Sequence, residues 1–276
     1  MIQTGEIARR LYDAVSREAE TLVVEDVRFG LSYVGIRLDN QRVGLAALLL
    51  HELPPGCSVF PDAHCHPRPR QGHSRAGSGG DPAAGTLAGS NASSLLRFLV
   101  EGKNPLEKAL GLATANAMMP PETAGDERDA LSIINLTPKD RVAMVGLFTP
   151  MVPKIEATGA KLSVIEKNPA RMKVPGREER EKILRECTVA IITATTLLNN
   201  TLENVLADLG EPRHVALLGP STPLCPEIFR GTPVTHLGGT IVRDADKVMQ
   251  IISEGGGTTA MRPYLRFINL LLPKTS

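Results

Sequence analysis

Five short, largely apolar runs separated by helical stretches fill the second half of this chain. The runs span residues 141–146, 161–166, 188–193, 214–219 and 233–238. Helix-like segments follow four of them, at 152–158, 177–187, 202–209 and 244–253. Strands that are apolar along their whole length and alternate with helices are typical of a parallel sheet covered on both faces. This half is therefore predicted to be an α/β domain. A late apolar stretch at 264–272 is a strand or a helix that the pattern does not place.

The first 120 or so residues follow a different pattern. Residues 4–21 carry apolar side chains on one stripe, which predicts an amphipathic helix. Strand-like runs at 22–29, 31–38 and 43–50 are joined by short links, which predicts an antiparallel meander. Two more helices are expected at 91–101 and 104–119, each opened by an asparagine that can cap it.

These patterns predict two domains, residues 1–122 and 123–276. Within the first, residues 61–82 contain four Gly, four Pro and no Val, Ile, Leu or Phe. A segment of that composition cannot bury a core, so we expect a flexible loop there.

Composition argues against two classes of binding partner, nucleic acids and membranes. Lys and Arg number 31 against 30 Asp and Glu, and the aromatic 3% of the chain includes no Trp. Nucleic-acid-binding chains usually show a basic excess or stacking aromatics, so we expect no nucleic-acid partner. Neither a membrane-spanning run nor a signal-peptide core is visible, and the four Cys are scattered, so we expect a cytoplasmic protein without a membrane partner. A homodimer is compatible with this size and class.

Small polar residues follow the predicted parallel strands. Ligands of such sheets bind beyond the carboxyl ends of the strands, which selects Gly146–Pro150, Glu166, the Thr193–Asn200 run, Gly219–Pro223 and Gly238–Gly239. Hydroxyls and amides in the Thr193–Asn200 run are suited to phosphate or carboxylate oxygens. The alternative is that Asn200 or Thr201 merely caps the next helix.

Glu166 follows Gly146 by twenty residues, the spacing at which a carboxylate binds a ribose in dinucleotide-binding folds. The G-x-G-x-x-G turn is absent, however, and Pro150 removes a backbone donor. The alternative is that Glu166 pairs with a lysine such as Lys154 or Lys167. No catalytic residue follows from the sequence, because no G-x-S-x-G elbow is present, and structural roles are expected for Cys225 and His236.

A Cys- and His-rich stretch supplies the donor atoms of a zinc or softer-metal site: Cys57, His64, Cys65 and His66. Its spacing is not that of a paired-ligand turn. The alternative is a solvated loop.

Several motifs together resemble a known family. They are GLSYVGIRL (30–38), AGTLAG (84–89), NPLEKALGLATANAM (104–118), VAMVGLFTP (142–150), ITATTLLNNTLENVL (192–206) and LLGPSTPLCPEIF (217–229). In this order they resemble the heavy-metal-chelation family of prokaryotic proteins. The resemblance implies an enolase N-terminal-like α+β domain followed by a Rossmann-like α/β domain.

The resemblance also implies a ligand site between the two domains. Its lining would be Asn116, Gly146, Phe148, Pro150, Glu166, Thr193, Thr195, Thr196, Asn199, Gly219, Pro220 and Ser221. Asn116 of the first domain would then face Glu166 and Asn199 of the second across one cleft. The implied ligand is a heavy-metal ion or a metal chelate.

We therefore expect the cleft to bind or process a small polar or anionic metabolite, or a metal chelate. A nucleotide-dependent oxidoreductase or methyl transferase is the alternative enzyme class. A non-catalytic sensor of metal or metabolite is the third possibility.

Overall fold

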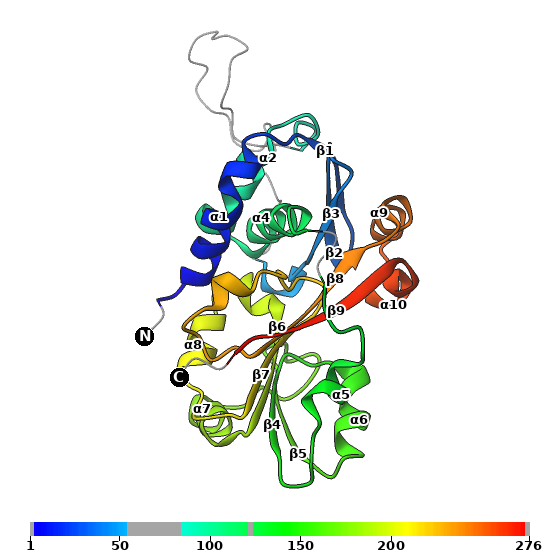
Figure 1. Cartoon of the computed structure of the whole chain (residues 1–276). Coiled ribbons are helices and arrows are strands. Elements are labelled where there is room, and N and C mark those ends of the chain that lie inside the picture. The colour runs from blue at the N-terminus through cyan, green and yellow to red at the C-terminus, as the bar shows by residue number, and fades with distance from the viewer. Residues whose placement is uncertain (1–2, 54–83, 121–123, 274–276) are drawn as a thin grey trace.

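The computed structural model describes residues 3–53, 84–120 and 124–273. The metal-donor candidates Cys57, His64, Cys65 and His66, and the loop expected at 61–82, lie outside the described residues. The domain boundary expected at residues 122 and 123 falls there too and stays a prediction. Figure 1 shows a small sheet and its helices above a larger sheet, with the late part of the chain reaching into both.

The N-terminal part is built around a three-stranded antiparallel sheet in the order β1-β2-β3. Its elements are α1 (Glu6–Ala19), β1 (Val24–Phe29), β2 (Tyr33–Leu38), β3 (Val43–Ala47), η1 (Leu50–Glu52), α2 (Ala92–Leu96), α3 (Phe98–Glu101) and α4 (Pro105–Ala117). The expected meander is confirmed. Asn91 and Asn104 cap α2 and α4 as expected, because each side chain accepts backbone N–H bonds. The single helix expected at 91–101 is instead two, α2 and α3.

The C-terminal part carries six strands in the order β5-β4-β6-β7-β8-β9. They are β4 (Arg141–Val145), β5 (Lys161–Ile165), β6 (Val189–Thr193), β7 (His214–Leu218), β8 (His236–Val242) and β9 (Leu265–Leu271). The first five are parallel, which confirms the expected α/β class, and β9 runs antiparallel to β8. The unplaced stretch at 264–272 is thus the strand β9 at one edge of the sheet.

Helices cover both faces of this sheet. They are α5 (Ala130–Ile134), α6 (Val152–Glu156), α7 (Arg177–Glu186) and α8 (Leu202–Ala207), with the short turns η2 (Thr149–Met151), η3 (Ala194–Leu197) and η4 (Pro226–Phe229). Met144 and Ile191 pack with Ile134 of α5 and Ile155 of α6 on one face. On the other face, the neighbouring strand residues, such as Ala143 and Ala190, pack in a cluster with residues of α7 and α8. Burial on both faces explains why these strands are apolar along their length.

The C-terminal part also covers the N-terminal sheet. After β8 come α9 (Ala245–Ser253), α10 (Thr258–Met261) and η5 (Arg262–Tyr264). Val248 and Ile252 of α9 pack against Tyr33 of β2 and Leu45 of β3. The small sheet therefore lies between α4 on one face and α9 on the other, as Figure 1 shows.

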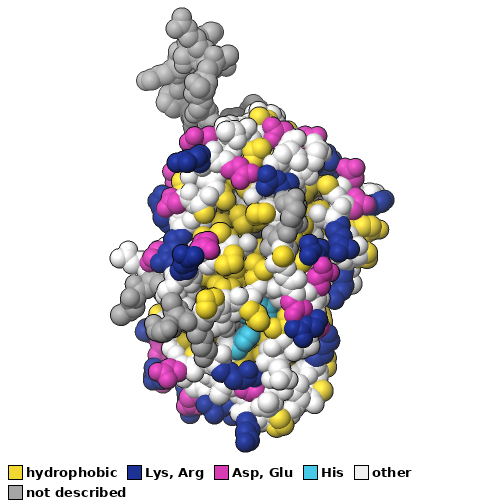
Figure 2. Space-filling model, viewed as in Figure 1, with side chains coloured by type: hydrophobic (Ala, Val, Ile, Leu, Met, Phe, Trp, Pro, Cys, Tyr) yellow, Lys and Arg dark blue, Asp and Glu magenta, His cyan; other side chains and the backbone are white. Residues whose placement is uncertain are grey.

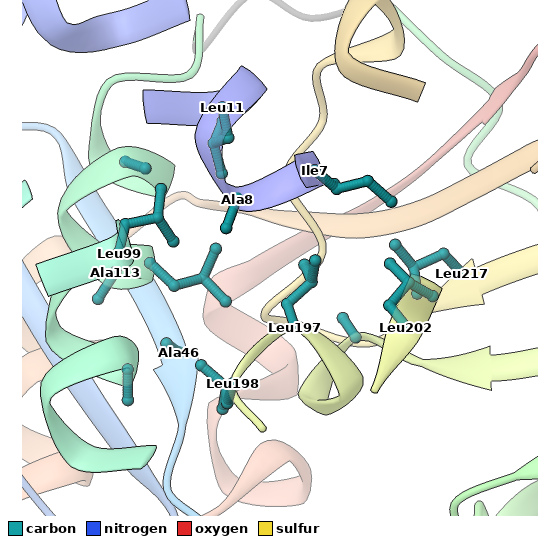
Figure 3. Packing of buried hydrophobic residues seen from close by; sticks show 14 of the residues in the cluster. Ile7, Ala8, Leu11, Ala46, Leu99, Ala113, Leu197, Leu198, Leu202 and Leu217 are labelled. Carbon is teal, nitrogen blue, oxygen red and sulfur yellow. The ribbon is translucent and has the colours of Figure 1, made fainter. Parts of the chain in front are cut away.

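One apolar cluster runs from the N-terminal helices into the large sheet. Ile7 and Leu11 of α1 belong to the same buried group as Leu197, Leu198 and Leu202. Figure 3 shows these side chains together with Ala46, Leu99, Ala113 and Leu217. Figure 2 shows apolar side chains gathered in the middle of one face, where the two parts meet, with charged side chains spread around them. Apolar burial thus fixes the two parts against each other.

A buried polar chain joins β7, β8 and β9. The Asn269 amide nitrogen donates to the carbonyls of Asp126 and Arg128, at 2.9 and 2.8 Å, so its oxygen must accept from Nε2 of His236 at 2.9 Å. Nδ1 of His236 then accepts from Nε2 of His214 at 3.0 Å. Burial lowers the pKa of His236 below its ordinary value of 6.5, although Asn269 and the charge of Asp126 oppose this. His236 is the satisfied structural histidine that the sequence suggested.

Within the described residues, no helix is both long and apolar enough to cross a membrane.

We predict that Gly44→Ala destabilises the protein by about 1–3 kcal/mol, because a Cβ on Gly44 would lie 2.0 Å from the backbone oxygen of Ala113 and 2.2 Å from the backbone nitrogen of Ala117. Denaturant unfolding measures this. Gly176→Ala is the matched control, since no atom lies within 4 Å of that position. Equal stability of the two variants would contradict the tight approach of α4 to β3.

The neutral His236 predicts a pH dependence of stability. Its folded pKa is lowered, so its contribution to the free energy of unfolding is complete above about pH 6.5 and is lost as the pH falls below that value. We expect His236→Gln to reduce the loss of stability between about pH 7 and pH 5. Urea unfolding at a series of pH values measures this. Parallel pH profiles for wild type and His236→Gln would show that His236 is not the titrating group.

Candidate functional site

A cavity of about 430 Å³ lies where the carboxyl ends of β4, β5 and β6 meet the N-terminal part. The large sheet contributes residues that follow these three strands: Gly146–Phe148, Glu166–Asn168, Arg171, Thr193, Thr195, Thr196 and Asn199. Ala47–Leu49, His51 and Glu52, from the end of β3 and from η1, form the wall on the opposite side. The cavity is thus shared by the two parts of the chain.

Sheet topology explains the position of this cavity. β5 lies on one side of β4 and β6 on the other, so the loops that leave β4 and β6 diverge to opposite faces. Open parallel sheets bind ligands at such a switch point. Gly146 begins the loop after β4 with a φ of 83°, and a Cβ there would lie 2.5 Å from Cγ2 of Thr193. Glycine is therefore required where these two loops approach each other.

Glu166 clamps the loops after β4 and β5 together. One carboxylate oxygen accepts the N–H groups of Lys167 and Asn168, at 2.8 and 3.0 Å. The other accepts the N–H of Leu147 at 3.2 Å and Nη1 of Arg171 at 3.0 Å. These four bonds fill the acceptor positions of the carboxylate.

The same contacts keep Glu166 ionised. Burial raises the pKa of this carboxyl, but the N–H groups of Asn168 and Leu147 and the charge of Arg171 outweigh burial and hold the pKa below its ordinary value. The lysine pairing considered for Glu166 is wrong: its cationic partner is Arg171, and Lys154 pairs with Asp129 at 2.7 Å.

Hydroxyl groups line the cavity after β6. The side-chain oxygens of Thr193 and Thr195 lie 3.1 Å apart. Only one of the two hydroxyl hydrogens can lie in that bond, so the other is free to meet a ligand. Thr196 instead donates to the carbonyl of Thr193 at 2.7 Å and so shapes the turn.

Asn199 links the two walls of the cavity. Its amide nitrogen lies 2.9 and 3.1 Å from the two carboxylate oxygens of Glu52, in η1. Its amide oxygen accepts from the hydroxyl of Thr201 at 2.7 Å. Asn199 therefore holds η1 over the carboxyl end of β6. The alternative of a capping Thr201 is not observed, because that side chain makes no capping bond to α8.

Three cations lie on the wall built by the loop after β5 and by α7. Arg171 keeps free N–H groups beyond its bonds to Glu166 and to the carbonyl of Leu147. Lys167 and Arg180 also line the cavity, and neither forms an ion pair with another described residue. Sequence reasoning missed Arg171, Arg180, His51 and Glu52. The signal for Arg171 was a basic loop after a strand whose carboxyl end points to a ligand, and Arg180 lies in the helix that follows this loop, α7.

The structure brings together seven of the residues implied by the family resemblance, namely Gly146, Phe148, Glu166, Thr193, Thr195, Thr196 and Asn199. Pro150, Gly219 and Pro220 are not among the residues that line this cavity. Pro150 lies in η2, and the carbonyl of Pro220 faces Thr240 of β8.

The expectation that Asn116 faces Glu166 and Asn199 is wrong. The Asn116 amide nitrogen donates to the carbonyls of Leu45 at 2.9 Å and Ser221 at 3.1 Å. The hydroxyl of Ser221 accepts the N–H of Ala47 at 2.8 Å. These three hydrogen bonds, here called the Ser221 bridge, tie β3 and α4 to the loop after β7. Asn116 and Ser221 are therefore held in the junction, and η1 occupies the place expected for Asn116.

Among the described residues, no group of three or more His, Cys, Asp or Glu side chains is arranged to hold a metal ion. Burial raises the pKa of Cys187 to about 11 and also raises the pKa of the half-buried Cys225. Neither thiol is a ready thiolate ligand. The described part of the chain does not fit a directly bound heavy metal.

Comparisons with known proteins agree with this architecture. Crystal structures of two proteins of unknown function from the DUF364 family are similar in fold. The one from Pyrococcus horikoshii has a TM-score of 0.74 at 20% identity, covering 96% of this chain and 100% of that one. The one from Desulfitobacterium hafniense has a TM-score of 0.75 at 21% identity, covering 98% and 99%.

Sequence comparison reaches the same family. An uncharacterised protein of Methanocaldococcus jannaschii is 29% identical over 151 residues, and this chain spans 58% of that relative's length. Residues 12–119 match the DUF4213 family and residues 129–271 match the DUF364 family, both described as "Putative heavy-metal chelation". The heavy-metal-chelation family expected from the motifs is confirmed, and the chain belongs to that family.

Proposed function

We propose that the chain binds a small anionic metabolite in the cavity between the large sheet and η1. The observation that carries this proposal is the inventory of unoccupied polar groups on the cavity wall. Lys167, Arg171 and Arg180 supply free donors, as does one hydroxyl of the Thr193–Thr195 pair. Of the three carboxylates in the lining, Glu166 and Glu52 already have partners, and Asp208 lies at the end of α8. A donor-rich wall favours a ligand with several carboxylate or phosphate oxygens.

Size and the apolar part of the lining support a metabolite of modest dimensions. A volume of about 430 Å³ lies in the lower part of the range usual for small-molecule sites. Leu49, Leu147, Phe148 and Val174 supply apolar surface beside the cations. The ligand we propose therefore combines a carbon skeleton with two or more anionic oxygens.

The family description is compatible with the absence of a metal-holding group among the described residues if the metal arrives already chelated. Carboxylate-rich metabolites bind divalent metals themselves, and the cavity would then recognise the free oxygens of the complex. This reading supports a role in handling metal chelates and needs no metal ligand from the described residues.

A nucleotide-dependent enzyme is less well supported. The carboxylate at the ribose-binding spacing, Glu166, already accepts four hydrogen bonds. A ribose would have to displace backbone groups that define the loops after β4 and β5. A panel of nicotinamide, adenosyl and flavin compounds in thermal unfolding separates this alternative from the anionic-metabolite proposal.

We predict that the double variant Lys167→Gln, Arg180→Gln weakens binding of citrate by roughly a hundredfold or more, because each of the two charge-assisted hydrogen bonds contributes about 1.5–3 kcal/mol. Calorimetric titration at low salt measures the dissociation constant, for citrate alone and for its nickel complex. The control is Lys173→Gln, Arg185→Gln, which removes the same charge from exposed residues that do not line the cavity. Wild-type affinity in the first variant, or no binding of citrate, inorganic phosphate or pyrophosphate to the wild type, would refute the proposal.

Asn199→Asp should weaken the closure of the cavity at neutral pH. The new carboxylate would lie where the amide now contacts both Glu52 oxygens, and the lost bond and repulsion should cost about 1–3 kcal/mol. Protonation of the introduced carboxylate at acidic pH should remove the repulsion and restore part of the lost stability. Thermal unfolding at pH 7.5 and pH 4.5 compares this variant with Asn204→Asp, an exposed residue of the same cavity. Identical melting of the two variants at pH 7.5 would contradict the role assigned to Asn199.

A further inference from the structure

A second, smaller cavity of about 210 Å³ lies across the same junction. It is lined by the turn Asn40–Val43, the end of α4, the loop after β7 and the end of β8. Along β3, Val43 lines this cavity whereas Ala47 lines the larger one, and the Ser221 bridge holds β3 between them at Leu45 and Ala47. Residues of both parts of the chain thus line a space that the proposed function does not use.

Two residues of this lining each carry a buried side-chain atom without a hydrogen-bond partner among the described residues, Oδ1 of Asn116 and Oγ1 of Thr222. The Asn116 amide cannot be reversed to cure this, because its nitrogen already donates to two carbonyls. Thr222 is 3% exposed. Buried polar atoms without a partner are rare in folded proteins and call for a physical explanation. A ligand that makes a hydrogen bond with each of the two atoms supplies one.

The rim of the cavity differs from its interior. Arg243 is exposed, and its guanidinium lies 3.8 Å from Glu127, beyond hydrogen-bond distance. Arg42 is already engaged, because it donates to the carbonyl of Met118 and pairs with Glu18. Arg243 thus shares Glu127 with Arg266, which lies 2.6 Å from that carboxylate, and its longer ion pair leaves its N–H groups for an anionic group. Val43, Leu224 and Ile241 supply apolar surface.

We propose that this cavity binds a small carboxylic acid with a hydrogen-bond donor on its α-carbon, an α-amino or α-hydroxy acid. An amino group, as the ammonium, would donate to both Asn116 Oδ1 and Thr222 Oγ1. A hydroxyl group would donate to Asn116 Oδ1 and accept from the Thr222 hydroxyl. In either case the carboxylate would meet Arg243. A short apolar side chain fits the remaining surface. Both unpaired atoms are closed off from solvent, so entry requires a small shift of the side chains around them.

Binding here would bridge the two parts of the chain, since Val43 and Asn116 come from one and Thr222 and Arg243 from the other. A ligand that contacts both raises the thermal stability of the folded protein by mass action. The inference is independent of the proposed function, because the two cavities have no lining residue in common.

The experiment is a thermal unfolding and calorimetric titration of the full chain with L-alanine, L-serine, L-lactate and D-glycerate. Acetate and ethylamine, which carry only the carboxylate or only the donor, are the comparison compounds. We expect saturable stabilisation by at least one of the four acids and none by acetate or ethylamine. The alanine and lactate arms distinguish an ammonium donor from a hydroxyl donor.

Thr222→Val tests the interior and Arg243→Gln the rim. Thr222→Val should leave the ligand-free melting temperature unchanged or raised, because it removes an unpaired buried hydroxyl, and should weaken binding by roughly tenfold. Arg243→Gln should weaken binding similarly, whereas Arg230→Gln, an exposed arginine outside the cavity, should not. Absence of saturable binding by all four acids, or wild-type affinity in both Thr222→Val and Arg243→Gln, would overturn the inference. Loss of citrate binding at the larger cavity would not affect it.

Discussion

The apolar junction between the N-terminal helices and the large sheet is the interaction on which the rest of the structure depends. Ile7 and Leu11 of α1 share one buried cluster with Leu197 and Leu202. The two parts of the chain therefore share a continuous hydrophobic core at this junction. The C-terminal helix α9 adds a second contact by covering the small sheet. This packing fixes where β3 ends, and so places η1 over the switch point of the large sheet.

Polar groups at the junction fall into two classes, those that organise the loops and those left free. Glu166, Asn199 and Ser221 all make hydrogen bonds that join separate segments of the chain. Lys167 and Arg180, in contrast, face the cavity without an ion-pair partner among the described residues. The residues that looked most functional in sequence are largely organisers. The cationic donors Arg171 and Arg180 lie in a loop and a helix to which the sequence patterns assigned no role.

Sequence patterns predicted what depends on local physics. Apolar runs marked the strands, because burial on both faces leaves a signal in every residue, and Asn91 and Asn104 marked the starts of helices because capping is local. Helix α9 was expected, but its position against β2 was not, since an amphipathic face does not name its partner. The same limit applies to Asn116: its amide could serve a ligand or two carbonyls, and only the approach of Leu45 and Ser221 decides between them.

Hydrogen–deuterium exchange of the full chain with and without saturating citrate tests most directly whether one cavity is built by both parts. We predict slowed exchange both in residues 47–52 of the N-terminal part and in residues 146–148, 166–168 and 193–199 of the large sheet. Slowed exchange confined to one part, or unchanged exchange in all of these segments, would contradict it.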